Sequence, residues 1–311
     1  ASQELDPLPP ILTALPHRRL PALRAHPLAQ VRDYAARAAG VLGDTATLRV
    51  LARVRDDNVA EVAIERLSAR TGHADDAVYL AAIRRDGAQV VRAAATALVG
   101  SPDRTVPAAA SAAFERWVTK ANASAHDART ALLKAAGRPA SDDRPPPVSV
   151  TLPPRAVALA LGEDVRLRVT MSEASGGGQF TVRLRGDVAP MMAARILALV
   201  QRGYYDGLTW HRVEADFVIQ GGSPGANEYV GLPSFLRDEL GTVPHPRGTV
   251  GMSTRGHDTG DAQWFVNLRD NRRLQRDYTV FGEVTDGIAV VDGVLEGDVI
   301  ASIRVLPPGI P

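Results

Sequence analysis

The sequence predicts two domains of different class, an array of paired α-helices followed by a domain built mainly of β-strands. Residues 1–140 hold 36 of the 49 alanines but only four of the 15 aromatic residues, whereas residues 141–311 hold 21 of the 27 glycines. Alanine favours closely packed helices, and glycine together with aromatic and β-branched residues favours strands and tight turns. With 311 residues, the chain is long enough for both domains.

A repeat in the first half predicts the helix pairs. Four similar windows follow one another at spacings of 28, 32 and 37 residues: Val31–Gly40, Val59–Ser68, Val91–Gly100 and Ala128–Gly137. Apolar residues recur at helical spacing within each window, and the final Gly or Ser suits a helix C-terminus. Each spacing accommodates two short helices and two turns, which is typical of an α-solenoid. The pattern resembles HEAT repeats, and we expect this domain to cover residues 1–137.

A proline-rich segment separates the two halves. Residues 138–147 contain four prolines and no apolar periodicity, and Pro153 and Pro154 continue the pattern. We therefore expect a stiff, irregular linker over residues 138–160. The second domain then covers residues 161–311.

The second domain opens with two strands and a helix. Val165–Met171 and Phe180–Arg185 alternate apolar with polar residues, as half-buried strands do. The glycine-rich stretch between them predicts a hairpin loop. Residues Ala189–Gly203 have helical spacing, with Pro190 near the first turn and a glycine at the end.

Five later segments carry the functional signal. They are Tyr204–Val213, Asp216–Gly222, Arg247–Met252, Ala262–Asn267 and Tyr278–Val284. In this order and spacing they resemble the cyclophilins, a family of peptidyl-prolyl cis-trans isomerases, over about residues 161–306. The resemblance implies an eight-stranded β-barrel capped by two helices.

Physical chemistry supports this function for the same residues. Rotation about an X–Pro amide meets a barrier of ~18–20 kcal/mol, and it makes or breaks no covalent bond, so we expect no metal and no cofactor. In the twisted state the proline nitrogen carries a localised lone pair, and a fixed donor aimed at that nitrogen assists only this state. Arg212 is the candidate catalytic donor, because it is always charged and lies on a predicted strand. Gln220 is expected to hold the substrate carbonyl through its amide.

The family resemblance also assigns a set of substrate-binding residues. They are Phe217, Val218, Ser253, Thr254, Phe265, Leu274 and Tyr278. The aromatic and aliphatic members of this set would form an apolar pocket for the proline ring. Two positions depart from many eukaryotic members of the family, because Arg273 stands in place of a pocket tryptophan and Tyr278 in place of a pocket histidine.

Composition argues against several other functions. The net charge of +1 provides no strong field for nucleic acid or an anionic membrane. The chain has no cysteine, which excludes disulfides and thiolate metal sites, and its apolar runs are too short for a membrane span. Gly221–Gly225 matches a hydrolase nucleophile motif, but Pro224 and polar residues follow where that motif needs a helix.

The expected partners are proline-containing peptides or partly unfolded proteins, with a possible protein partner on the helical repeats. Two other interpretations stay open: a non-catalytic proline-binding or holdase module tethered to a repeat scaffold, and a structural protein in which the solenoid has the main role. Because the chain begins Ala1-Ser-Gln-Glu, we expect a processed protein of the bacterial cell envelope or a secreted one. The alternative location is the cytoplasm.

Overall fold

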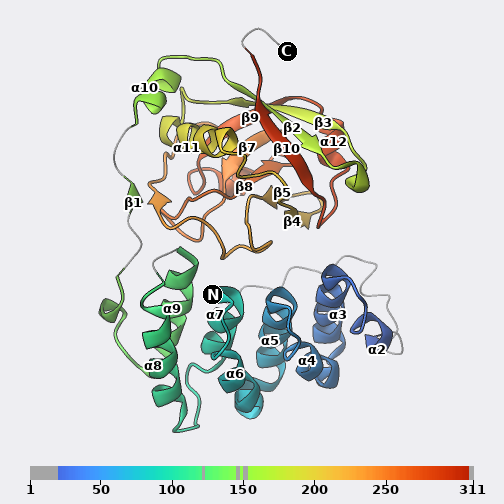
Figure 1. Ribbon diagram of the computed structural model, residues 1–311, viewed down its shortest axis with the longest axis vertical. Coiled ribbons are helices and arrows are strands. Elements are labelled where there is room, and N and C mark those ends of the chain that lie inside the picture. Colours follow the sequence, from blue (N-terminus) through green and yellow to red (C-terminus); the bar gives the residue numbers. More distant parts are fainter. Residues whose placement is uncertain (1–19, 121–122, 145–147, 150–152, 308–311) are drawn as a thin grey trace. The chain divides into compact units, whose positions relative to one another are not determined.

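The computed structural model describes residues 20–120, 123–144, 148–149 and 153–307, and the chain divides into two compact units between Pro145 and Pro146. The first unit is helical and the second is built around a curled β-sheet (Figure 1). Two domains of different class were predicted from composition alone, and the structure confirms that prediction.

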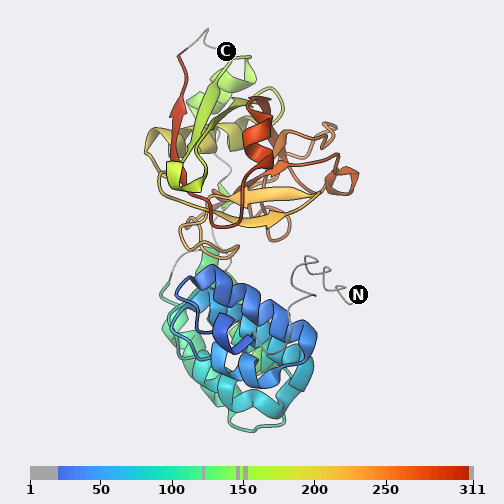
Figure 2. The ribbon, with the colours of Figure 1, turned by 90° about the vertical axis from the view of Figure 1, so that its right-hand side faces the viewer.

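Helices account for the regular structure described in the first unit. They are α2 (Leu20–Leu23), α3 (Ala29–Leu42), α4 (Thr45–Leu51), α5 (Asp57–Thr71), the 3-10 turn η2 (Gly72–Asp75), α6 (Asp76–Ala82), α7 (Ala88–Ala97), α8 (Val106–Trp117), α9 (Ala123–Ala136) and the 3-10 turn η3 (Ala140–Asp142). The four repeat windows fall on α3, α5, α7 and α9, which pack against one another in succession (Figures 1 and 2). Helices α4, α6 and α8 pack against α5, α7 and α9 respectively.

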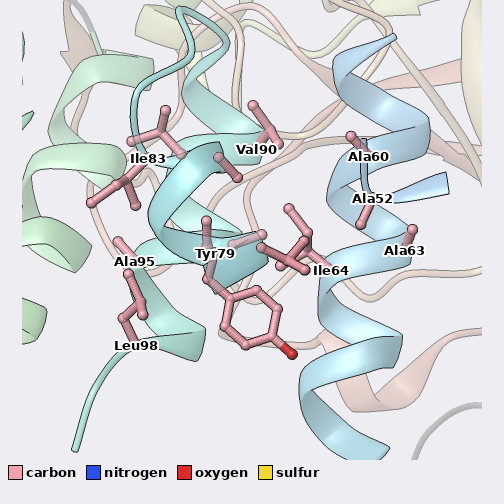
Figure 3. Close-up of a cluster of buried hydrophobic side chains, with 14 of the residues drawn as sticks. Ala52, Ala60, Ala63, Ile64, Tyr79, Ile83, Val90, Ala95 and Leu98 are labelled. Carbon is pink, nitrogen blue, oxygen red and sulfur yellow. The ribbon is translucent and has the colours of Figure 1, made fainter. Parts of the chain in front are cut away.

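The helical unit has a hydrophobic core of its own, in which small residues let neighbouring helices approach. Ala60, Ala63 and Ile64 of α5 are fully buried, as is Tyr79 of α6. Figure 3 shows the Tyr79 ring lying close to Ile64, with the alanines of α5 beside them. Because alanine adds little side-chain volume, neighbouring helices can approach closely, and the Tyr79 ring fills part of the space between them.

Arginine contacts recur along the helical unit. Just after α6, Arg85 donates to the carbonyl oxygen of Arg55 after α4, at 2.8 Å. In α8, Arg116 donates to the carbonyl oxygen of Ile83 after α6, also at 2.8 Å. Each guanidinium therefore satisfies a carbonyl left without a partner at the end of the equivalent helix about one repeat earlier.

The assignment of these helices to HEAT repeats stays a prediction. In the described part of the chain, no helix has the length and apolar character needed to cross a bilayer.

The second unit contains an eight-stranded antiparallel sheet in the order β10-β2-β3-β9-β7-β8-β5-β4. The strands are β2 (Arg166–Met171), β3 (Gln179–Leu184), β4 (Trp210–Glu214), β5 (Val218–Gly221), β7 (Thr249–Met252), β8 (Trp264–Asn267), β9 (Val280–Asp286) and β10 (Ile300–Val305). The two outer strands meet through an antiparallel bridge between Thr209 and Val299, and Trp210 N–H donates to the Asp298 carbonyl at 2.9 Å. The sheet therefore closes into the predicted barrel.

Two helices lie at opposite ends of this barrel, as the sequence predicts (Figures 1 and 2). Helix α11 (Pro190–Gln201) contributes seven buried residues to the barrel core, including Met192 and Ile196. Helix α12 (Ile288–Asp292) is shorter and contributes Val291. The apolar faces of both helices therefore close the interior of the barrel to water.

Regular structure occurs in the described part of the proline-rich segment, which corrects the expectation of irregular chain up to residue 160. Helix α10 (Pro154–Ala160) follows a short strand β1 (Val148–Ser149) that pairs in parallel with β6 (Phe235–Leu236). Pro154 begins the helix, a position where the missing proline N–H has no intrahelical partner to lose. Ala156 and Leu159 of α10 are buried in the barrel core.

Replacing Leu159 tests whether α10 belongs to the barrel. We expect Leu159→Ala to lower the free energy of unfolding of the barrel unit by about 2–4 kcal/mol, because it removes a buried side chain. Val157→Ala, on the exposed side of the same helix, should change it by less than about 0.5 kcal/mol. Urea unfolding would follow the fluorescence of Trp210 and Trp264 in a Trp117→Phe chain. Equal effects of the two variants would contradict this placement of α10.

Candidate active site

The strands of the barrel have two faces with different roles. Because successive residues of a strand point to opposite sides, Ile219, Trp264 and Val266 enter the barrel core. Their neighbours Val218 and Phe265 point the other way and belong to a second hydrophobic cluster that is separate from the core. This outer cluster lies on the outside of the barrel wall.

The outer cluster brings together five of the seven predicted substrate-binding residues. They are Val218, Phe265 and Leu274, which are buried, and Phe217 and Tyr278, which are partly buried. The Phe265 ring packs edge-on against Tyr278, with centroids 5.8 Å apart, and lies nearly parallel to the His245 ring at 6.1 Å. The result is a preformed apolar surface with aromatic walls, which suits a proline ring.

A glycine provides room for the central ring of this cluster. Gly251 of β7 pairs directly with Phe265 of β8. A Cβ atom on Gly251 would lie 2.4 Å from Cζ of the Phe265 ring, which is far inside van der Waals contact. The ring can therefore lie against the strand only because residue 251 has no side chain.

A β-bulge in β4 aims Arg212 at the outer cluster. Trp210 pairs with Gly221 and Arg212 pairs with Gln220, so two steps along β4 match one step along β5 and His211 is the extra residue. Without the bulge, Arg212 would share the inward face of Trp210, which is fully buried in the barrel core. The bulge reverses this and places Arg212 on the outer face.

Arg212 lies between the polar and apolar parts of the site. Its Nη1 donates to Oε1 of Gln220 at 3.4 Å, and its guanidinium carbon is 5.8 Å from the centroid of the Phe217 ring. Carboxylates of Glu214 and Glu228 lie 3.6 and 3.8 Å from its Nε. The side chain is 31% exposed, so the guanidinium is positioned by its neighbours and still accessible to a ligand.

Gln220 is held by a second glutamine that the sequence prediction missed. Gln220 is buried, and its Nε2 donates to Oε1 of Gln263 at 3.4 Å. Gln263 Nε2 in turn donates to the carbonyl oxygens of Glu228 at 2.9 Å and Val230 at 3.3 Å. These bonds fix which end of each amide is the donor. The alternation of β8 could have indicated Gln263, because it precedes Phe265 by two residues and shares its face.

A buried polar network supports the outer cluster. Asn271 Nδ2 donates to the carbonyl oxygen of Phe217 at 2.9 Å and to Oδ1 of Asn267 at 2.6 Å. Asn267 is fully buried, and its Nδ2 donates to Oγ1 of Thr249 at 2.8 Å. The network ties the turn before β5 and the loop after β8 to the barrel wall, which fixes Phe217 relative to Leu274.

Comparison with known proteins assigns the second unit to a family. Residues 167–308 match the family description "Cyclophilin type peptidyl-prolyl cis-trans isomerase/CLD". A protein of Helicobacter pylori strain J99 named peptidyl-prolyl cis-trans isomerase is 35% identical over 134 residues, which are 42% of this chain and 83% of that protein. The chain belongs to the cyclophilin family.

Other known proteins are similar to the chain over a comparable length. Peptidyl-prolyl cis-trans isomerase B of Bacillus subtilis is 35% identical over 131 residues, 42% of this chain and 92% of that protein. A crystal structure of a Cryptosporidium parvum cyclophilin type peptidyl-prolyl cis-trans isomerase aligns with 46% of this chain and 98% of its own, with 21% identity and a TM-score of 0.43. The sequence predictions of family and enzyme class are confirmed.

Two histidines of the cyclophilin domain are kept neutral near the site. Burial lowers the pKa of His211 to about 4, and both of its ring nitrogens are shielded from solvent. Burial also lowers the pKa of His245, whose Nδ1 accepts from Asn267 and whose Nε2 donates to the Tyr278 carbonyl at 3.2 Å. At neutral pH, neither of these two histidines therefore presents an imidazolium that could compete with Arg212 for an electron-rich ligand group.

Ser253 and Thr254, the other two predicted substrate-binding residues, are polar and are not members of the hydrophobic outer cluster. They follow β7 directly, are partly exposed, and Ser253 N–H donates to the carbonyl oxygen of Gln263 at 2.9 Å. This bond places them beside the Gln220–Gln263 end of the site, and their part in substrate binding stays a prediction.

Over residues 20–307, with the undescribed gaps left out, no group of three or more His, Asp or Glu residues is arranged to hold a metal.

Gly251→Ala should impair the cyclophilin site without removing any functional group. The added methyl group must displace the Phe265 ring, and we expect kcat/KM for an Ala-Pro peptide to fall roughly 10- to 100-fold, as for other angstrom-scale misplacements at active sites. Gly241→Ala is the matched control, because its Cβ would meet nothing closer than 3.6 Å. Isomerisation rates and thermal unfolding of both variants would be compared. A folded Gly251→Ala protein with full activity would show that the ring position is not critical.

Proposed function

We propose that the cyclophilin domain accelerates cis-trans isomerisation of X–Pro bonds in peptides and protein clients. The observation that carries the proposal is the placement of a charged donor, Arg212, beside both the apolar cluster and the anchored amide of Gln220. The names of the bacterial relatives point to the same reaction. In this function the outer cluster receives the proline ring and the two polar side chains act on the amide that precedes it.

Each group has a distinct part in the rotation. Once the amide is twisted, the proline nitrogen gains a localised lone pair, and an Arg212 N–H directed at it stabilises that state more than the planar ground state. By analogy with donors in oxyanion holes, one such interaction contributes about 3–4 kcal/mol, or two to three orders of magnitude in rate. Gln220 gives one Nε2–H to Gln263 and has a second for the substrate carbonyl.

The site supplies positioning and charge, and the reaction needs nothing else from the protein. Glu214 and Glu228 restrain the Arg212 guanidinium from one side, which lowers the cost of ordering it when the substrate binds. The proline ring excludes water from the outer cluster, and exclusion of water strengthens the donor's interaction with the nitrogen. A module that only bound proline would need the apolar cluster but not a restrained arginine at its edge.

Arg212→Ala should separate catalysis from binding. We expect kcat/KM for an X–Pro peptide to fall about 100- to 1,000-fold, because the donor acts only in the twisted state, while the dissociation constant for the peptide changes much less. Arg168→Ala, which removes an arginine of β2, is the matched control. Uncatalysed exchange takes tens of seconds, so the assay has a clear baseline. A wild-type protein that binds the peptide without accelerating its exchange would favour the non-catalytic alternative.

For the helical unit, we propose a role in holding the client protein. The unit has its own core, and its surface carries several large apolar side chains that a partly unfolded client could cover. They are Leu28, Val41, Val50, Val99 and Val118, each between 44% and 58% exposed. Dispersed apolar contacts of this kind suit weak, reversible binding of unfolded chains.

The client-holding role predicts a substrate-dependent difference between the full chain and the cyclophilin domain alone. A protein that starts at Pro146 keeps β1 and α10, so it retains the complete barrel core. We expect both proteins to isomerise a tetrapeptide equally well, and the full chain to be several-fold better at refolding a protein limited by prolyl isomerisation. Equal refolding activity of the two proteins would contradict this role.

A further inference from the structure

A second arginine lies on the edge of the outer cluster. The guanidinium carbon of Arg273 is 4.0 Å from the centroid of the Phe217 ring, closer than that of Arg212. Arg273 belongs to the 3-10 turn η5 (Arg272–Leu274), and the next residue, Leu274, is buried in the outer cluster. The backbone at Arg273 is therefore tied to the pocket, and its exposed side chain is held over the ring by a cation–π contact.

The loop around Arg273 is basic in a domain that is otherwise acidic. Residues 146–311 contain 16 arginines, no lysine and 19 acidic residues, whereas residues 269–277 contain four arginines and two aspartates. The four arginines are exposed. Among the residues that the structure describes, Arg273 has the Phe217 ring as its partner and no carboxylate within ion-pair distance. This edge of the pocket therefore has a local excess of positive charge.

The two arginines beside the Phe217 ring differ in their counter-charges. Arg212 has the carboxylates of Glu214 and Glu228 within 4 Å of its Nε, so its charge is largely compensated there. Arg273 lacks such compensation within the described part of the chain. A charged residue of a bound peptide would therefore experience an attractive or repulsive field mainly from the Arg273 side.

We propose that Arg273 determines client preference by pairing with an aspartate or glutamate close to the target proline. The contact with Phe217 is made at the guanidinium carbon, and a guanidinium carries five N–H donors, so a pair of donors remains for a bidentate bond with a carboxylate. Because the side chain is already held in place, the pair forms at a small entropic cost. The inference rests on the proposed function, in that the same pocket must take the proline.

The test uses the full chain and two sets of three otherwise identical peptides. In the first set, Glu, Gln or Lys directly precedes an Ala-Pro unit. In the second set, the same three residues directly follow the proline. Dissociation constants would be measured by NMR titration and kcat/KM by the isomerisation rate, at low and physiological salt. In one of the two sets, the Glu peptide should bind roughly two- to fivefold more tightly than the Gln peptide, as for a partly exposed ion pair. The Lys peptide should bind more weakly than both.

Two variants distinguish a specific pair from general charge. Arg273→Gln should bring the ratio of the Glu and Gln dissociation constants to about one. Arg272→Gln removes the same charge from the neighbouring position, which is exposed and is not stacked on Phe217, and should retain most of the preference. Added salt should weaken the preference in the wild-type protein.

The outcomes also separate this inference from the proposed function. If all three peptides are isomerised and all three bind with equal affinity, the role of Arg273 is overturned and the isomerase function stands. A preference for Glu in binding, lost in Arg273→Gln but without catalysed exchange, would support Arg273 and overturn the isomerase. An equal loss of affinity for all peptides in Arg273→Gln would show that the arginine only supports the Phe217 ring, and would overturn the inference. The absence of any detectable peptide binding would also overturn the inference.

Discussion

The β-bulge at His211 is the constraint on which the site depends. Strand β4 must place Trp210 in the barrel core, where its ring packs edge-on against Trp264 at a centroid distance of 5.0 Å. The same strand must place Arg212 on the outer surface two residues later. A regular strand would place both on the same face, and a guanidinium in the apolar core would carry a large desolvation penalty. The extra residue resolves this conflict, and His211 itself is kept neutral by burial. Stability and function are therefore coupled through one irregularity in one strand.

The two faces of the barrel wall divide these tasks. The inner face holds the large continuous core, and the outer face holds a small cluster that adds little to it. A small apolar cluster on a surface would not fix its own geometry, because few contacts constrain each ring. The buried amides of Asn267 and Asn271 supply that constraint through directional bonds to Phe217 and Thr249. Hydrogen bonds define the shape of the pocket, and apolar contact defines what enters it.

The sequence predicts the segments of the site better than its supporting groups. The family motifs identify Arg212, Gln220 and the apolar residues because these are contiguous in short segments. The bulge is not visible in a single strand, since it is defined by the register with its neighbour. Gln263 and Asn267 look like ordinary strand residues until the outer face of β8 is known. Helix α10 is missed because a pair of prolines signals irregular chain, although proline is also favourable at the first position of a helix.

Phe217 is the residue at which the two halves of the site meet. In the proposed function, Arg212 directs its charge at the proline nitrogen, and the nearby carboxylates of Glu214 and Glu228 reduce its attraction for other anions. Recognition of the client is assigned to Arg273. This arginine lies closer to the same ring, has no such carboxylates in the described structure, and faces solvent. A lysine could not replace it, because a compact ammonium cannot both stack on the ring and present a planar pair of donors. The two arginines differ in their counter-charges, and that difference allows one pocket to separate catalysis from selection of the client.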